Sequence, residues 1–89
     1  MTGELVVNAR RLSGDGPLWM LQEAGAAGAP RIRLIVSDEA TAGAVMEALR
    51  RCGIRASLDP IGGEFHVLCQ TTPQGRTALK AYLDQPDQR

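Results

Sequence analysis

The sequence predicts an α/β protein: a two-layer sandwich with a four-stranded mixed sheet, in the order β-α-β-α-β-β, plus a C-terminal helix. Segments rich in β-branched residues alternate with segments of helical periodicity, and clusters of Gly and Pro separate them. The 89 residues, 44% of them hydrophobic, suffice for a single domain with a small core. Right-handed crossovers place the first two helices on one face of the sheet if these helices connect neighbouring parallel strands.

A glycine-containing loop joins the first strand to the first helix. Residues 4–10 (ELVVNAR) are typical of a strand. Pro17 suits the first turn of a helix, where its missing N–H is no loss, and Asp15 or Gly16 is expected as the N-cap residue. The helix is expected to reach about residue 27. Its candidate core positions are Leu18, Leu21 and Ala24, with Met20 and Ala27 as weaker candidates.

The middle of the chain predicts a strand followed by a helix. Residues 31–36 (RIRLIV) have the period-2 pattern of a strand with one apolar face. That face holds Ile32, Leu34 and Val36, and the opposite face holds Arg31, Arg33 and Ile35. A helix over about 39–52 follows, with Ser37 or Asp38 as its N-cap. Gly53 stands where a left-handed residue commonly follows a helix.

The next segment predicts a β-hairpin. Strands over 54–58 and 64–70 flank a five-residue turn cluster at 59–63. Alternation along the second strand puts Phe65, Val67 and Cys69 on one face. His66 falls on the other face, which is expected to point away from the helices.

A third helix is predicted over about 72–85, with Thr72 as its N-cap, and residues 86–89 are expected to fray. Its apolar stripe consists of Ala78, Leu79, Tyr82 and Leu83. Such a stripe must be buried somewhere. The open sheet face, an edge strand and a second copy of the chain all remain possible places, so the oligomeric state stays open.

Composition excludes several classes of function. Ten Lys and Arg residues balance ten Asp and Glu residues, which argues against a protein that grips nucleic acid through its phosphates. We expect no secretory signal and no membrane span, because no apolar stretch is long enough. Cys52 and Cys69 have neither metal-ligand nor disulfide spacing, so no metal site and no cofactor are predicted. A cytoplasmic protein with free thiols is the expectation.

The first loop resembles that of the TusA-like (SirA-like) sulfur carrier proteins. Those proteins have a strand ending in D-A-R-G-L, then x-C-P-x-P, then a helix. Here residues 8–12 (NARRL) align with the first motif, and residues 13–17 (SGDGP) align with the second. The identical motif positions are Ala9, Arg10, Leu12 and Pro17. In element order and spacing the resemblance covers about residues 4–70, while the C-terminal helix departs from it.

The resemblance implies a two-layer α/β fold and a persulfide carried from a cysteine desulfurase to an acceptor, by way of the motif cysteine. In this chain Gly14 stands at the cysteine position and Asp15 at the first proline. A glycine cannot hold a persulfide, and Asp15 beside a helix N-terminus opposes an anionic thiolate. The expectation is therefore a degenerate member: a non-catalytic binding or regulatory module linked to sulfur or selenium metabolism. Its protein partner, such as a sulfur-relay component, would contact the motif loop at Arg10, Gly14, Asp15, Gly16 and Pro17.

An active sulfur-transfer protein is the alternative, with Cys52 or Cys69 as the thiol, and this leaves open whether the protein is an enzyme. Cys69 is expected in the core beside Val67, because free cysteines are among the most buried residues. Cys52 lies at a helix C-terminus, which raises a thiol pKa and disfavours a nucleophile.

A further alternative is a small RNA- or ligand-binding α/β domain. Arg31, Arg33 and His66 are expected on the outward sheet face, where they would form a mildly basic surface. The scarcity of aromatic residues for base stacking argues against RNA as the ligand.

Overall fold

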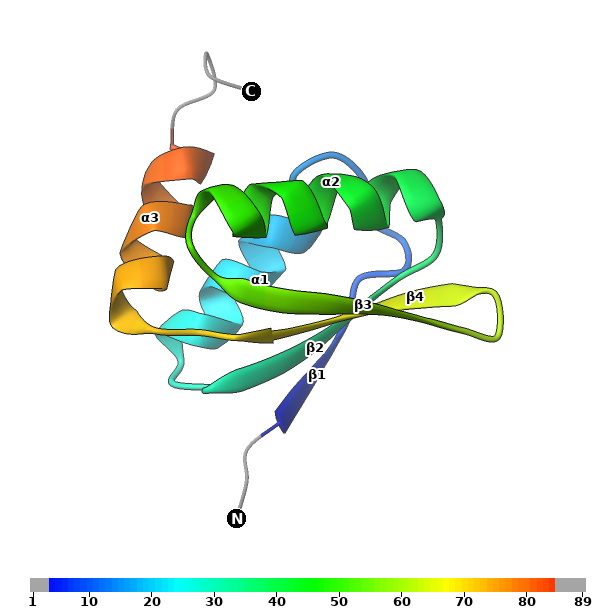
Figure 1. Ribbon diagram of the computed structural model, residues 1–89, viewed down its shortest axis with the longest axis horizontal. Helices are drawn as coiled ribbons and strands as arrows, with labels where there is room; N and C mark the ends of the chain where they lie inside the picture. Colours follow the sequence, from blue (N-terminus) through cyan, green and yellow to red (C-terminus); the bar gives the residue numbers. More distant parts are fainter. Residues whose placement is uncertain (1–3, 85–89) are drawn as a thin grey trace.

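Seven elements follow the predicted order, and the structure, a computed structural model that describes residues 4–84, confirms the α/β fold class (Figure 1). The strands are β1 (Glu4–Asn8), β2 (Arg31–Val36), β3 (Arg55–Ile61) and β4 (Glu64–Gln70). The helices are α1 (Gly16–Ala26), α2 (Glu39–Arg51) and α3 (Pro73–Leu83).

The four strands form one mixed sheet in the order β1-β2-β4-β3. β1 runs parallel to β2, whereas β4 is antiparallel to both β2 and β3. Val7, Leu34, Val67 and Leu58 occupy one row across all four strands. Because paired residues share a face, this row marks the face that the helices cover.

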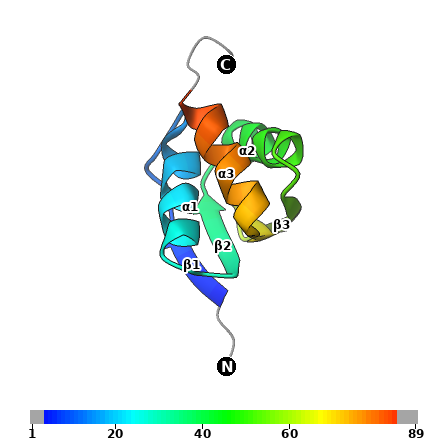
Figure 2. The same ribbon diagram turned by 90° about the vertical axis from the view of Figure 1, so that its left-hand side faces the viewer.

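All three helices lie on the same side of the sheet, which leaves the opposite face open (Figure 2). The core lies between the two layers, and every fully buried residue among those that the structure describes is apolar. Its largest fully buried side chains are Leu21, Ile32, Leu34, Val36, Val45, Leu49, Val67 and Leu79. At about 25 cal/mol per Å² of buried apolar surface, such side chains provide most of the drive to fold.

The third helix packs within the helical layer and does not cover the open sheet face. α3 lies across the ends of α1 and α2 (Figure 2), and its Leu79 and Leu83 are buried. Gly25 of α1 lets the Arg76 side chain approach closely, and Gly75 does the same for Ile54. The apolar stripe of α3 is therefore used inside the chain.

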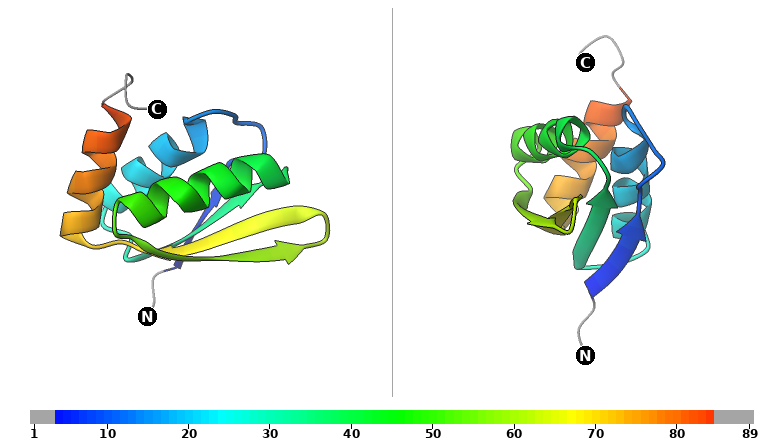
Figure 3. Two further views of the ribbon diagram at one scale, coloured as in Figure 1. Left: turned by 45° about the horizontal axis from the view of Figure 1, so that its top comes forward. Right: turned by 90° about the vertical axis from the view of Figure 1, so that its right-hand side faces the viewer.

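The hairpin is longer than predicted, and its turn is shorter. β3 continues through Asp59, Pro60 and Ile61, which pair with residues 64–66 of β4. The turn consists of Gly62 and Gly63 alone, both with positive φ (58° and 84°), as a two-residue hairpin turn requires. Proline is tolerated at an edge because an outward position needs no N–H. The hairpin extends beyond α2 (Figure 3).

Other boundaries differ by a few residues. β1 ends at Asn8 and not at residue 10, because the chain turns into the loop at Ala9. Cys52 follows α2 as its C-cap, and Gly53 has the expected left-handed φ of 73°. Asp38 and Thr72 accept N-cap hydrogen bonds at the starts of α2 and α3. α3 ends at Leu83, and the predicted fraying of residues 86–89 lies outside the described residues.

Met20 and Ala27 were wrong as core candidates. Met20 is 36% exposed, and Ala27 is exposed at the C-cap of α1. At 100° per residue, Met20 points about 200° away from Leu18, which is buried. None of the helices between residues 4 and 84 is both long and apolar enough to cross a membrane.

Candidate binding loop and the buried thiols

Hydrogen bonds to Ile35 of β2 and to Ser37 fix the start of the loop between β1 and α1, the motif loop of the resemblance described above. Ala9 is buried, and its N–H donates to the carbonyl of Ile35 at 2.9 Å. The hydroxyl of Ser37 donates to the carbonyl of Arg10, also at 2.9 Å. The loop thus leaves the sheet in a defined direction at the carboxyl ends of the parallel strands β1 and β2.

Arg10 ties this loop to the hairpin. Its Nη2 donates to Glu64 Oε1 at 2.9 Å, and its Nε donates to the other carboxylate oxygen. This bidentate contact lowers the pKa of Glu64 and raises that of Arg10. Arg10, the motif arginine, therefore helps to position the loop.

Gly14, which the resemblance aligns with the motif cysteine, faces open space. Its φ is 59°, and a Cβ placed there would meet no atom within 4 Å. The next turn of the loop is closed by Gly16, whose N–H donates to the carbonyl of Ser13 at 3.1 Å. A Cβ at Gly16 would lie 3.1 Å from the Cβ of Leu12, so the Leu12 side chain rests on this glycine.

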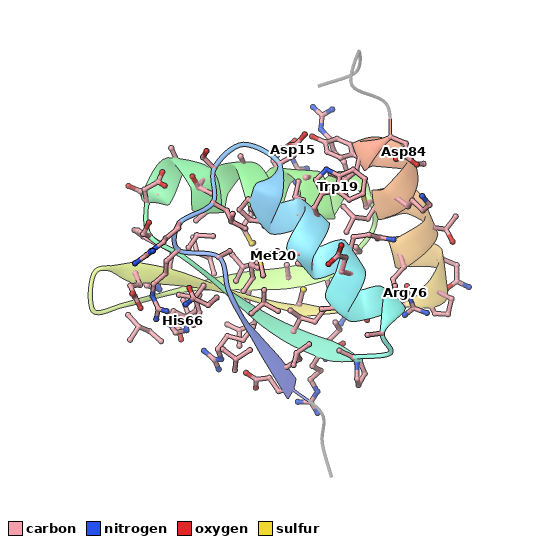
Figure 4. The ribbon with its side chains drawn as sticks, turned by 180° about the vertical axis from the view of Figure 1, so that it is seen from behind. Asp15, Trp19, Met20, His66, Arg76 and Asp84 are labelled. Atoms are coloured by element: carbon pink, nitrogen blue, oxygen red, sulfur yellow. The ribbon has the colours of Figure 1, made fainter. Side chains whose placement is uncertain are left out.

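Asp15 occupies the N-cap position of α1, as expected, but its side chain makes no capping hydrogen bond to the helix. Its carbonyl accepts the N–H of Trp19 at 3.0 Å and so begins the helix. Pro17, in the first turn, is fully buried. Asp15 and Trp19 lie at the same end of α1 in Figure 4.

A shallow depression of about 340 Å³ lies beside the loop. Its lining residues are Asn8, Arg10, Arg11, Leu12 and Met20. Leu12 and Met20 are 37% and 36% exposed, so the depression combines apolar surface with two arginine side chains. Met20 was missed as a surface residue, although its helical position, away from the buried stripe, was a readable signal (Figure 4).

Both thiols lie in the core, away from solvent. Cys52 is 9% exposed and Cys69 is 4% exposed, and both cysteines are free. Burial raises the pKa of the Cys52 thiol, and it raises the pKa of Cys69 to about 11. Since the thiolate is the nucleophile, neither site favours sulfur chemistry near neutral pH.

Of the three basic residues expected on the open sheet face, Arg33 and His66 contact each other, whereas Arg31 lies apart from them. Arg33 Nη1 lies 3.1 Å from His66 Nδ1, and Arg33 Nε donates to Glu4 at 2.6 Å. A guanidinium can only donate, so Nδ1 of His66 is the acceptor in this contact. Nε2 is 3.9 Å from a Glu64 oxygen, and the His66 side chain is 14% exposed. Arg31 bonds to neither Arg33 nor His66, so the structure brings only two of the three together.

Comparison of the chain with protein-family models, with curated proteins and with solved structures finds no match. Among the described residues, no group of three His, Cys, Asp or Glu side chains is placed to hold a metal ion.

Proposed function

We propose that this protein is a non-catalytic binding module of the sulfur-carrier type, and that its motif loop binds a protein partner. The observation behind this proposal is Gly14: the exposed position at which the resembling proteins have their thiol has no side chain. The two thiols that the chain does have are buried, with raised pKa values. Burial therefore weighs against the alternative of sulfur transfer through Cys52 or Cys69.

The surface beside the loop supports a partner of defined chemistry. Leu12 and Met20 are exposed, and Arg10 and Arg11 border the same depression. Because Arg10 already binds Glu64, Arg11 is the arginine available for a new ion pair. The partner surface is thus expected to present an apolar side chain next to a carboxylate. A component of a sulfur relay, such as a cysteine desulfurase, is the partner class that the resemblance implies.

Trp19 allows a direct binding test, because it is the only tryptophan and lies one turn beyond the loop. Its emission, together with backbone amide shifts, is to be followed while a tryptophan-free cysteine desulfurase is added. We expect saturable changes that include residues 10–20. Leu12→Ser and Met20→Ser should each weaken binding about tenfold, as for a central apolar contact.

Val6→Ser provides the matched control, since Val6 is 57% exposed on β1 but is not one of the residues that line the depression. It should leave the affinity unchanged. Thermal melting of each variant separates lost contacts from lost folding. Absence of any saturable change, or equal weakening by Val6→Ser, contradicts loop-mediated binding of this partner.

A further inference from the structure

The open face of the sheet contains a second hollow, separate from the motif loop. It has a volume of about 360 Å³ and lies where β2 begins and β4 ends. On the open face it is lined by Glu4, Arg31, Arg55, Ser57, Leu68 and Gln70. The motif loop contributes no residue to it, so the hollow is independent of the function proposed above.

Two arginines flank this hollow on either side of one strand. Arg31 of β2 and Arg55 of β3 both pair with Gln70 of β4. Their side chains therefore share a face, with backbones about 10 Å apart at two strand spacings. Between these backbones lie Gln70 and, in the next row on this face, the half-buried Leu68, both of β4. Ser57 of β3 pairs with Leu68 and so follows Arg55 on the same face.

The charges of Arg31 and Arg55 are not balanced within residues 4–84. Elsewhere on this face Arg10 binds Glu64 and Arg33 binds Glu4. The side chains of Arg31 and Arg55 make no hydrogen bond and no ion pair with any described residue.

Glu4, the one carboxylate lining the hollow, is already engaged by Arg33 at 2.6 Å. The lining of the hollow thus carries two positive charges, and its one negative charge, on Glu4, is already paired with Arg33.

We propose that this hollow is a binding site for a phosphate monoester dianion. Two guanidinium groups on one face match an anion with two charges and several acceptor oxygens, because guanidinium binds phosphate through paired N–H donors. Ser57 and Gln70 add neutral donors at the edge of the site. Leu68 offers apolar contact to the organic group that bears the phosphate. The volume, at the lower end for ligand sites, fits a small molecule.

Phenyl phosphate is the probe of choice, because it joins a phosphate dianion to a small apolar group. Its titration into the labelled protein at pH 7.5 is followed by backbone amide shifts. The expected result is saturable binding, with shifts confined to the start of β2, the start of β3 and the end of β4. Benzoate, with one charge, is expected to bind at least about tenfold more weakly, as is inorganic phosphate, which lacks the apolar group.

Arg31→Gln and Arg55→Gln test the two arginines separately, and each is expected to weaken phenyl phosphate about tenfold. Arg50→Gln is the matched control: it removes one positive charge from α2, on the helical side of the molecule, and should leave binding unchanged. Since Arg31 and Arg55 have no described partner, both variants should melt at the temperature of the parent protein, which excludes loss of folding as the cause.

Three results would overturn the proposal. The first is the absence of saturable shifts with phenyl phosphate. The second is equal affinity for benzoate, which would remove the role of the second charge. The third is equal weakening by Arg50→Gln, which would show that binding depends only on the net charge of the protein.

Discussion

Arg10 in the motif loop and Glu64 at the start of β4 form a bidentate ion pair across 54 residues of chain. This contact couples the loop to the hairpin, although the two segments are far apart in the sequence. It also gives the loop a titratable anchor, because the pair exists only while Glu64 is ionised.

Acid should release the loop. Arg10 lowers the pKa of Glu64 below its ordinary value of 4.5. The contribution of the pair is therefore complete above that value and is lost as the pH falls through the lower pKa of the folded protein. Amide shifts of residues 9–14 should therefore change as the pH falls below about 4.5.

Glu64→Gln should produce the same change in the loop at pH 7. Glu47→Gln is the control, because Glu47 also has a lowered pKa but pairs with Arg50 and Arg51 on α2. Loop shifts that follow Glu47→Gln, or that ignore Glu64→Gln, would show that the ion pair does not anchor the loop.

Two helical glycines should respond in opposite directions to substitution by alanine. Gly75 is buried in α3, and a Cβ there would lie 2.7 Å from Ile54 Cγ1. Gly75→Ala should lower the free energy of unfolding by about 1–3 kcal/mol through overpacking.

Gly43 is exposed in α2, and a Cβ there would meet nothing within 4 Å. Gly43→Ala should raise the free energy of unfolding by about 0.5–1 kcal/mol, since alanine is the better helix former. Urea titration measures both values. Equal effects of the two substitutions would mean that α3 does not pack on Ile54 as described.

The docking of α3 should make a large contribution to stability. Leu79 of α3 is completely buried in the core. Leu79→Ala should cost about 2–5 kcal/mol in unfolding free energy, the range for a cavity in a packed core. Lys80→Ala, which removes an exposed side chain paired with Asp84, should change it by less than about 0.5 kcal/mol. A small effect of Leu79→Ala on the unfolding free energy would indicate that α3 contributes little to the stability of the core.

The thiols of the folded protein should alkylate slowly. Burial raises the pKa of Cys69 to about 11, so its reaction rate should keep rising with pH up to that value. In denaturant both thiols should react at the rate of a free cysteine. Rapid labelling of either residue at pH 7 in the folded protein would contradict the burial of that thiol.

The element order was predictable because periodicity, caps and glycines agree locally. Asp38, Thr72 and Gly53 each mark a helix end for a reason that can be read from neighbouring residues. The extent of β3 was not predictable in this way. Pro60 indicates a break, but at an edge position it pairs with Phe65 and the strand continues.

The candidate sites depend on pairings that no local pattern specifies. Arg10, Arg31, Arg33 and His66 were expected on or near the sheet, but their partners follow from the order β1-β2-β4-β3. That order puts Glu64 beside Arg10 and places Gln70 between Arg31 and Arg55. Arg55 was not predicted as a site residue for this reason. The hairpin pattern does not show that β4, and not β3, pairs with β2.

The most direct test of the central claim is persulfide loading. The protein is incubated with a cysteine desulfurase, its pyridoxal cofactor and free cysteine, and the intact mass is then measured with peptide mapping. A variant with Gly14→Cys and Asp15→Asn is treated in parallel, because it places a thiol at an open position beside the N-terminus of α1. The account predicts no added sulfur on the natural chain and one added sulfur at position 14 of the variant. A stable persulfide on Cys52 or Cys69 of the natural chain would contradict it.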